Sequence, residues 1–414
     1  MPDTLIGRVP EEWTETTLAE LCGSGGGDIQ TGPFGSQLHA SDYVPSGIPS
    51  VMPQNIGDNV ILEDGIARIT PADAQRLSRY LLAPGDIVYS RRGDVERRAW
   101  VHPQQAGWLC GTGCLRVRLG NSASSRFLSY YLGHPEVRAW IVRHAIGATM
   151  PNLNTGILGA VPVIIPPLPG QAAITAMLGA LDDKIALNDT IARHTRELAR
   201  AHFRQAAEFP GAEEFGLSAV VELLNRGVTP RYTEDSAQLR ILNQKCIRNG
   251  RVSLTPARRT LADKVPGAKL LATCDVLVNS TGMGTLGRVA RWTRPEACTA
   301  DSHVTIVRFD AAKIDPVCAG FAMLDAEPEI EALGEGSTGQ TELSRAQLSA
   351  LRITVPSPDR AGRLRPLLDA LESRGDCALE ESGSLVALRD TLLPKLMSGE
   401  IRVREAEKAV EGVT

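Results

Sequence analysis

Two long stretches of the chain carry apolar residues at helical spacing. The first series steps alternately by three and four residues and includes Ile174, Leu178, Leu181 and Ile185. The second has an apolar residue at every seventh position: Leu364, Leu371, Ala378, Leu385 and Leu392. A seven-residue apolar repeat keeps one seam of a helix against a partner helix. We therefore expect a helix over 171–208 and a weaker one that Gly375 interrupts and that Pro394 kinks or ends.

The two predicted helices need a partner for their apolar seams. The first would be roughly 57 Å long at 1.5 Å per residue. Alone, each would expose its seam to water, so we expect the two to pair antiparallel. The alternative is that each packs on its own globular unit.

The rest of the chain contains an internal repeat. Four segments recur in the same order at an offset of 189 or 190 residues: 85–93 with 274–282, 114–119 with 304–309, 147–149 with 336–338, and 161–167 with 351–357. The first two pairs contain short β-branched runs after a turn, which are typical of buried strands. We expect a short helix near the start of each copy, at 18–21 and 220–224.

These patterns predict a mixed α/β protein in which two globular heads, related by a pseudo-two-fold repeat, alternate with two long antiparallel coiled-coil helices. The proline-rich segments 166–169 and 356–358 end each head and lead into a helix. The expected domains are a first head, a first spacer helix, a second head, and a second spacer helix with a tail, over 1–167, 168–210, 211–356 and 357–414.

Composition narrows the class of protein. The chain is 43% hydrophobic and 22% charged, as in ordinary globular proteins. It has no run of 18 apolar residues and no basic segment followed by an apolar one at its start, so we expect a cytoplasmic protein outside the membrane. Its eight cysteines are irregularly spaced, which favours reduced thiols over disulfides. Cys110 and Cys114 form the closest pair, too little for a zinc site.

The net charge of −4 conceals two basic islands. Residues 68–143 contain 12 Lys and Arg against 5 Asp and Glu, and residues 226–308 contain 14 against 6. One island falls in each predicted head, as expected for two faces that bind a polyanion. The alternative is that each island is a solvated surface whose arginines are paired with acids from elsewhere in the fold.

Several stretches resemble the specificity subunit of Type I restriction-modification systems. They are Val163–Gln171, Leu181–Asn188 and Leu392–Val403, in the order that the family shows. The resemblance covers nearly the whole chain. Two departures are Gly170, where the family more often has an acidic residue, and the second proline-rich exit, which lacks a matching Gln.

The resemblance implies a subunit that recognises DNA and performs no chemistry itself. Each head would be a target recognition domain that reads one half of a split, asymmetric sequence in double-stranded DNA. The helices would set the unread gap and dock two methyltransferase (modification) subunits. The residues expected to form the coiled coil and this docking surface are Ile174, Leu178, Leu181, Ile185, Leu371, Leu385 and Leu392. The modification subunits would bring S-adenosylmethionine, and separate motor-nuclease (restriction) subunits would bring ATP hydrolysis with its Mg²⁺. No cofactor or metal is expected on this chain.

The residues themselves also argue against an active site. The chain has no Asn/Asp-Pro-Pro-aromatic loop of an adenine methyltransferase, since Pro167 is followed by Leu168. The glycine-rich segment 23–28 lacks the Gly-Lys-Ser/Thr that grips phosphates. Asp301, Ser302 and His303 are adjacent in sequence, but nothing around them predicts a nucleophile elbow.

The loop after the matched strand in each head is our candidate DNA contact. Arginine forms paired hydrogen bonds with guanine or phosphate, and asparagine does so with adenine. The predicted DNA-binding residues are Arg91, Arg92, Arg97, Arg98, Thr149, Asn152, Lys245, Asn279, Ser280, Thr281, Arg288 and Arg291. Segments 149–152 and 338–341 are secondary candidates, and Gln37 and His39 beside the turn 32–35 are weaker ones.

Two other functions fit the same patterns. One is a structural scaffold whose basic faces bind acidic proteins, which would show no preference among DNA sequences. The other is the recognition subunit of a related restriction enzyme with a different architecture. For a DNA-binding chain, affinity should fall steeply with salt, by about 0.9 in log K per phosphate neutralised for each unit of log salt.

Overall fold

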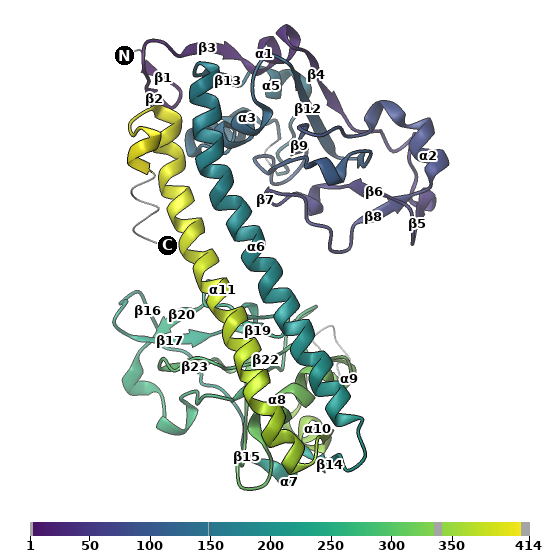
Figure 1. Ribbon diagram of the computed structural model, residues 1–414, viewed down its shortest axis with the longest axis vertical. Helices are drawn as coiled ribbons and strands as arrows, with labels where there is room; N and C mark the ends of the chain where they lie inside the picture. The colour runs from purple at the N-terminus through teal and green to yellow at the C-terminus, as the bar shows by residue number, and fades with distance from the viewer. Residues whose placement is uncertain (1–2, 148, 335–341, 407–414) are drawn as a thin grey trace. The chain divides into compact units, whose positions relative to one another are not determined.

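The computed structural model describes residues 3–147, 149–334 and 342–406. The chain forms two compact units, one made of Met1–Ala186 with Ser382–Thr414 and the other of Leu187–Glu381. The boundary between them falls inside both long helices, α6 (Leu168–Ala207) and α11 (Pro358–Ser398) (Figure 1). Each unit therefore consists of one mixed α/β head and one part of each long helix.

The first head is built on two sheets. A five-stranded sheet has the order β4-β12-β9-β10-β7, and a four-stranded sheet has the order β11-β6-β8-β5. Their strands are β4 (Gly26–Thr31), β5 (Tyr43–Val44), β6 (Ile48–Val51), β7 (Asp58–Asn59), β8 (Ala67–Ile69), β9 (Ile87–Ser90), β10 (Arg98–Trp100), β11 (Leu109–Cys110) and β12 (Cys114–Gly120). The remaining elements are β1 (Asp3–Thr4), β2 (Gly7–Arg8), β3 (Thr14–Thr17), α1 (Leu18–Ser24), α2 (Pro71–Arg76), α3 (Ser125–Tyr131), α4 (Pro135–His144), α5 (Thr155–Gly159) and β13 (Pro162–Ile165).

The second head repeats the arrangement of the first. Its two four-stranded sheets have the orders β15-β24-β21-β22 and β16-β20-β17-β23. Their strands are β15 (Val221–Arg226), β16 (Tyr232–Thr233), β17 (Leu239–Leu242), β20 (Arg258–Thr260), β21 (Val276–Asn279), β22 (Val289–Arg291), β23 (Cys298–Ala300) and β24 (Val304–Phe309). The remaining elements are β14 (Glu213–Gly216), α7 (Leu217–Val220), β18 (Ile247–Arg248), β19 (Arg251–Val252), α8 (Pro316–Asp325), α9 (Glu327–Ala332), α10 (Arg345–Ala350) and β25 (Arg352–Val355). The internal repeat is therefore a repeat of structure.

The predicted strands of both copies are confirmed, and one predicted helix is wrong. β9 and β21 are fully buried and lie between neighbours in their sheets. The helix expected at 18–21 is α1, capped by Thr17 and Glu20. The helix expected at 220–224 ends at Val220, because Val221–Arg226 pairs with β24 as a strand.

The second long helix is more continuous than its sequence indicates. α11 runs through both Gly375 and Pro394 to Ser398. Leu396 and Met397, beyond the proline, are buried in the core of the first unit, and this packing outweighs one missing backbone hydrogen bond. At Gly375 a Cβ atom would collide with the guanidinium of Arg251. A larger residue at this position would displace the Arg251 side chain.

Both units bury the helical seams as predicted. In the first unit Ile174, Leu178, Leu181, Leu385 and Leu392 share one core with the head, and Ile185 packs against it. In the second unit Ala199, Phe203, Ala361 and Leu368 do the same, and Leu364 and Leu371 pack against them. Each helix therefore also packs on a globular head, as the alternative interpretation expected.

The direction of pairing is visible within the second unit. The Asn188 amide donates to Glu381 at 2.9 Å, and the Arg360 guanidinium lies 3.7 Å from the centroid of the Phe209 ring. As residue numbers rise along α6 they fall along α11, so the helices are antiparallel.

Candidate DNA interface

Three loops of the first head meet where β9 ends. The backbone N–H of Arg91 donates to the Gly113 carbonyl at 2.8 Å, and the Arg91 carbonyl accepts from Leu153 at 2.8 Å. The backbone of Arg92 pairs with that of Asn152 in an isolated antiparallel β-bridge. The predicted loop and the secondary candidate 149–152 are therefore neighbours.

The side chains on these loops suit a polyanion. Arg92 and Thr149 are exposed. Arg91 is half-buried, and its guanidinium lies 6.0 Å from the ring centroid of Phe34, which is itself 55% exposed. In the part of the chain that the structure describes, neither arginine has an ion pair. These cations are thus free to meet phosphates or base edges.

The second head holds its loop with the same backbone hydrogen bonds. The N–H of Ser280 donates to the His303 carbonyl at 2.9 Å, and the Ser280 carbonyl accepts from Leu343 at 2.8 Å. Thr281 forms a bridge with Glu342. Each contact matches one in the first head at the offset of the sequence repeat. The further candidate 338–341 lies outside the described residues.

A buried ion pair supports the strand before each loop. The Asp86 carboxylate accepts two hydrogen bonds from Arg118, at 2.7 and 2.6 Å. Asp275 accepts two from Arg308, at 2.8 and 2.7 Å. Both aspartates are almost fully buried. Each also accepts a backbone N–H three residues earlier in the chain, which closes the turn into the strand.

Two of the predicted DNA-binding arginines lie in the interior instead. Arg98 is 3% exposed, donates to the Ser129 carbonyl at 2.6 Å and pairs with Asp58 at 3.2 Å. Arg291, also 3% exposed, pairs with Glu372 of α11. Buried guanidiniums that are held by carboxylates cannot reach DNA without breaking the fold. The prediction that they contact DNA is wrong for this reason.

Asn279 and Ser280 are corrected in the same way. Both are fully buried. The Asn279 amide donates to the carbonyls of Gln244 and Thr285, each at 3.0 Å, and the Ser280 hydroxyl lies 2.5 Å from that of Thr305. They shape the loop and do not face solvent.

The other candidates remain at the surface. Lys245 is exposed. Arg97 is exposed and pairs with Asp94 at 2.8 Å. Arg288 is half-buried and donates to the Gly284 carbonyl at 2.8 Å. Their contact with DNA stays a prediction.

Ion pairing lowers the number of basic side chains in each island that are available to bind a polyanion. In the first island seven of the twelve basic side chains lie within 4 Å of a carboxylate: Arg76, Arg97, Arg98, Arg116, Arg118, Arg126 and Arg138. In the second the paired side chains are Arg226, Arg251, Lys264, Arg291, Arg294 and Arg308. A basic remainder survives in each head, and in the first it includes Arg91 and Arg92.

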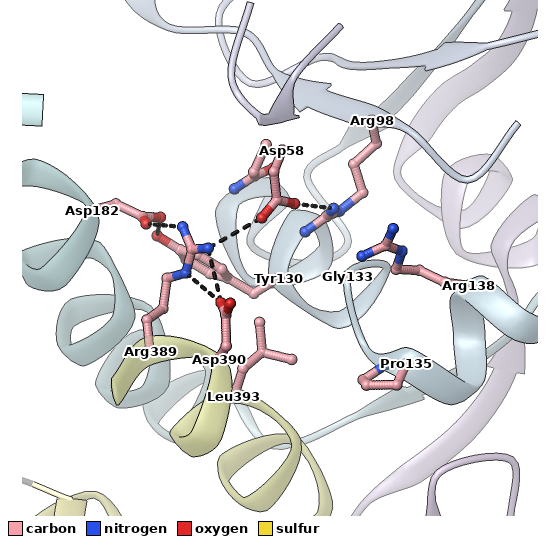
Figure 2. A pocket seen from close by; sticks show the side chains of 11 residues that line it. Asp58, Arg98, Tyr130, Gly133, Pro135, Arg138, Asp182, Arg389, Asp390 and Leu393 are labelled. Atoms are coloured by element: carbon pink, nitrogen blue, oxygen red, sulfur yellow. Dashed lines mark hydrogen bonds and ion pairs between the residues drawn. The ribbon is translucent and has the colours of Figure 1, made fainter. Parts of the chain in front are cut away.

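One network in the first unit ties α11 to the head. The Arg389 guanidinium contacts Asp182 of α6 at 2.8 Å and Asp58 of the head at 3.1 Å (Figure 2). The Tyr130 hydroxyl donates to Asp182 at 2.6 Å. Burial opposes ionisation of Asp58, but Arg98 and Arg389 hold the pKa of this carboxyl below its ordinary value. The network lines a small cavity in which the arginine and aspartate charges neutralise one another. We therefore assign the network a structural role.

Sequence reasoning missed three polar or aromatic residues at the loops. Phe34 lies within the turn 32–35, and this turn was the only feature of the sequence that pointed to it. Gln244 and His303 both contact Thr281. They are distant from that residue in sequence, so no local pattern could group them.

The described residues contain neither a metal cluster nor a membrane helix. Nowhere in 3–147, 149–334 or 342–406 do three His, Cys, Asp or Glu side chains come close enough to share a metal ion. Burial raises the pKa of Cys110 to about 12 and that of Cys114 well above its ordinary value, so both are protonated core thiols. No described helix is long and apolar enough to cross a bilayer.

Comparisons with known proteins point to one family. A family model described as the Type I restriction modification DNA specificity domain matches residues 10–193. A search of curated proteins gives no match. The crystal structure of the Type I restriction-modification S subunit from M. genitalium superposes with a TM-score of 0.58 at 16% identity, covering 94% of this chain and 96% of that one. This likeness shows a shared fold.

Two further solved structures have lower scores. The HsdS subunit from Thermoanaerobacter tengcongensis is 17% identical with a TM-score of 0.36, over 95% of this chain and 98% of that one. A chain from a structure on complex assembly and conformational transition of the type I R-M system is 16% identical with a TM-score of 0.42, over 95% and 100%.

Proposed function

Because residues 10–193 belong to the Type I restriction-modification DNA specificity domain family, we propose that the whole chain is a bipartite DNA-recognition subunit. Each head reads one half of an asymmetric target in double-stranded DNA. The match itself covers the first head and α6 as far as residue 193.

One observation carries the extension to the second head. The hydrogen bonds that hold the loop of Arg91 in the first head recur around Ser280 in the second. The buried pair of Asp86 with Arg118 recurs as Asp275 with Arg308. A head that keeps the framework of a DNA specificity domain is best explained as a second such domain.

The two half-sites should differ in sequence. Arg92 is exposed on the loop of the first head, whereas the matching residue of the second head is Thr281, which is half-buried. Arginine favours guanine and phosphate, whereas hydroxyl side chains bond more broadly. Different side chains on one framework give two specificities within a single chain.

The long helices are the proposed docking surface for two methyltransferase subunits. Leu187 and Leu198 of α6 are 53% and 48% exposed, and exposed leucines in a row on a helix suit burial by a partner. Leu187→Glu combined with Leu198→Glu should abolish co-purification with the modification subunit while the melting temperature stays the same. Normal co-purification would remove this face from the interface.

The partner subunits would supply the chemistry. S-adenosylmethionine would bind to the methyltransferase subunits, and ATP with Mg²⁺ to motor-nuclease subunits. Under this proposal the chain is not an enzyme, holds no cofactor, and works in the cytoplasm where its DNA target lies.

The decisive experiment is selection from a random duplex library, with the full chain in the presence and absence of its modification subunit. We expect two short sequences at a constant separation. Binding without sequence preference would instead favour the scaffold function. A single uninterrupted site would contradict the bipartite model.

A further inference from the structure

Three polar side chains of the second head form a chain of hydrogen bonds at the DNA-facing loop. The Gln244 amide nitrogen lies 3.0 Å from the Thr281 carbonyl oxygen and 2.7 Å from the Thr281 hydroxyl. That hydroxyl lies 2.8 Å from Nδ1 of His303. Gln244 and Thr281 are half-buried, and His303 is exposed.

The direction of each bond in this chain follows from its first member. A carbonyl oxygen only accepts, so the Gln244 atom beside the Thr281 carbonyl is the amide nitrogen. The same nitrogen donates its second proton to the Thr281 hydroxyl. Among the described residues, Nδ1 of His303 is the remaining partner of that hydroxyl, and the Thr281 O–H finds an acceptor within the chain when it donates to Nδ1.

In this direction of bonding the proton of His303 lies on the opposite edge of the ring. With Nδ1 accepting, the neutral imidazole carries its hydrogen on Nε2. The residue is also held through its backbone, because its N–H donates to Asp301 at 2.9 Å and its carbonyl accepts from Ser280 at 2.9 Å. The second head therefore presents an exposed N–H donor of fixed direction.

We propose that His303 reads a base in the second half-site by donating from Nε2 to an acceptor on the base edge, such as a purine N7 or guanine O6. Thr281 and Gln244 are positioning residues that set the tautomer and the ring orientation. The inference rests on the proposed function. A base edge is favoured over a phosphate because a fixed direction matters for base reading, whereas Lys245 nearby already offers an exposed cation for the backbone.

The first head provides an internal control. The residue that matches His303 there is Gly113, which has no side chain to donate. Loss of the imidazole should therefore affect only the half-site read by the second head.

The test compares selected sequences for the wild-type chain, His303→Ala, Thr281→Val and Thr281→Ser, with melting temperatures for all four. His303→Ala should lower discrimination at one base pair of the second half-site by roughly 2- to 12-fold, the range for one neutral hydrogen bond. The first half-site and the melting temperature should not change. Thr281→Val keeps the shape but removes the hydroxyl, and it should lower discrimination at the same base pair. Thr281→Ser keeps the hydroxyl and should discriminate as the wild type does.

Nitrogen-15 spectra of the histidine-labelled chain give a readout other than DNA binding. The proton should reside on Nε2 of His303 in the wild type and distribute between both nitrogens in Thr281→Val. Unaltered half-sites in His303→Ala, or a uniform loss of affinity for all duplexes, would overturn base reading by His303 and leave the proposed function standing. A wild-type chain that selects no sequence would overturn the proposed function itself.

Discussion

The two heads differ least where their loops are anchored and most where the loops end. Asp86 and Asp275 each hold an arginine through two hydrogen bonds and close the preceding turn through a third. The residues that follow the strands have no such likeness, because Arg91 and Arg92 in the first head correspond to Ser280 and Thr281 in the second. The comparison teaches that the buried ion pair and the backbone hydrogen bonds hold both loops alike, while the side chains on the loops differ.

Under the proposed function, this arrangement lets one framework carry two specificities. Backbone hydrogen bonds hold both loops, and they do not depend on which side chains the loops bear. His303 stands at the position equivalent to Gly113, and its carbonyl accepts the same backbone N–H. The loops can therefore change in chemistry without loss of the fold.

The largest effect should come from a charge in the helical seam. Leu181→Asp or Leu385→Asp places an unpaired carboxylate in the first unit's core, where both leucines are at most 3% exposed, and should cost about 3–5 kcal/mol. Chemical denaturation should show the loss, and hydrogen exchange should confine it to the first unit. Leu187→Asp, at an exposed position of α6, is the matched control and should change stability by less than about 0.5 kcal/mol. Equal losses in all three variants would contradict a buried seam.

The anchoring pairs should respond alike in the two heads. Asp86→Asn and Asp275→Asn each remove the charge that faces an arginine while keeping the shape, and each should cost about 2–3 kcal/mol, reduced by the partial exposure of the arginines. Hydrogen exchange should place each loss in its own head. A clear loss for one variant and none for the other would mean that the two frameworks are not equivalent.

The loop arginines should affect binding and not folding. Arg91→Ala combined with Arg92→Ala should weaken DNA binding by about 1–3 kcal/mol for each base that the loop no longer reads. If the two arginines bind only phosphates, all sequences should weaken alike and the salt slope should fall by about one per phosphate. Arg79→Ala removes an exposed arginine outside these loops and serves as the control. Unaltered affinity in the double variant would exclude this loop from the interface.

A smaller, pH-dependent difference should separate the first head from the second. Burial lowers the pKa of His134, whose Nδ1 accepts the Glu136 N–H and caps α4. The unfolded chain then takes up this proton more readily than the folded one, so stability falls as the pH drops below the ordinary value near 6.5. His134→Asn keeps a cap that does not titrate, and relative to it the wild type should lose stability between pH 7 and pH 5. Parallel pH profiles of the two proteins would contradict a neutral, capping His134.

Sequence reasoning identified the features that repeat locally. The seam shows in the seven-residue spacing of Leu371, Ala378 and Leu385, and the heads show in strands such as Ile87–Ser90 that recur at a constant offset. What it missed depends on distant partners. Arg98 and Arg291 are held in the interior by the carboxylates of Asp58 and Glu372. These partners lie 40 and 81 residues away in the sequence, so no local pattern shows the pairing.

The same limit applies to the candidate site. The loops were found because they follow predictable strands, but the hydrogen bonds of Thr281 join residues 22 and 37 positions away. The continuity of α11 through Pro394 was missed because packing of Leu396 and Met397, not local propensity, decides it.

The division of the chain into units also has a consequence for its synthesis. The second unit is one continuous segment, Leu187–Glu381, whereas the first needs both the beginning of the chain and Ser382 onward. Leu385, Leu392 and Met397 complete the first unit's core, yet they are translated after the whole of the second unit. The core of the first unit therefore stays incomplete until the second unit has been translated in full. A chain truncated after residue 381 would contain all of the second unit but only part of the first.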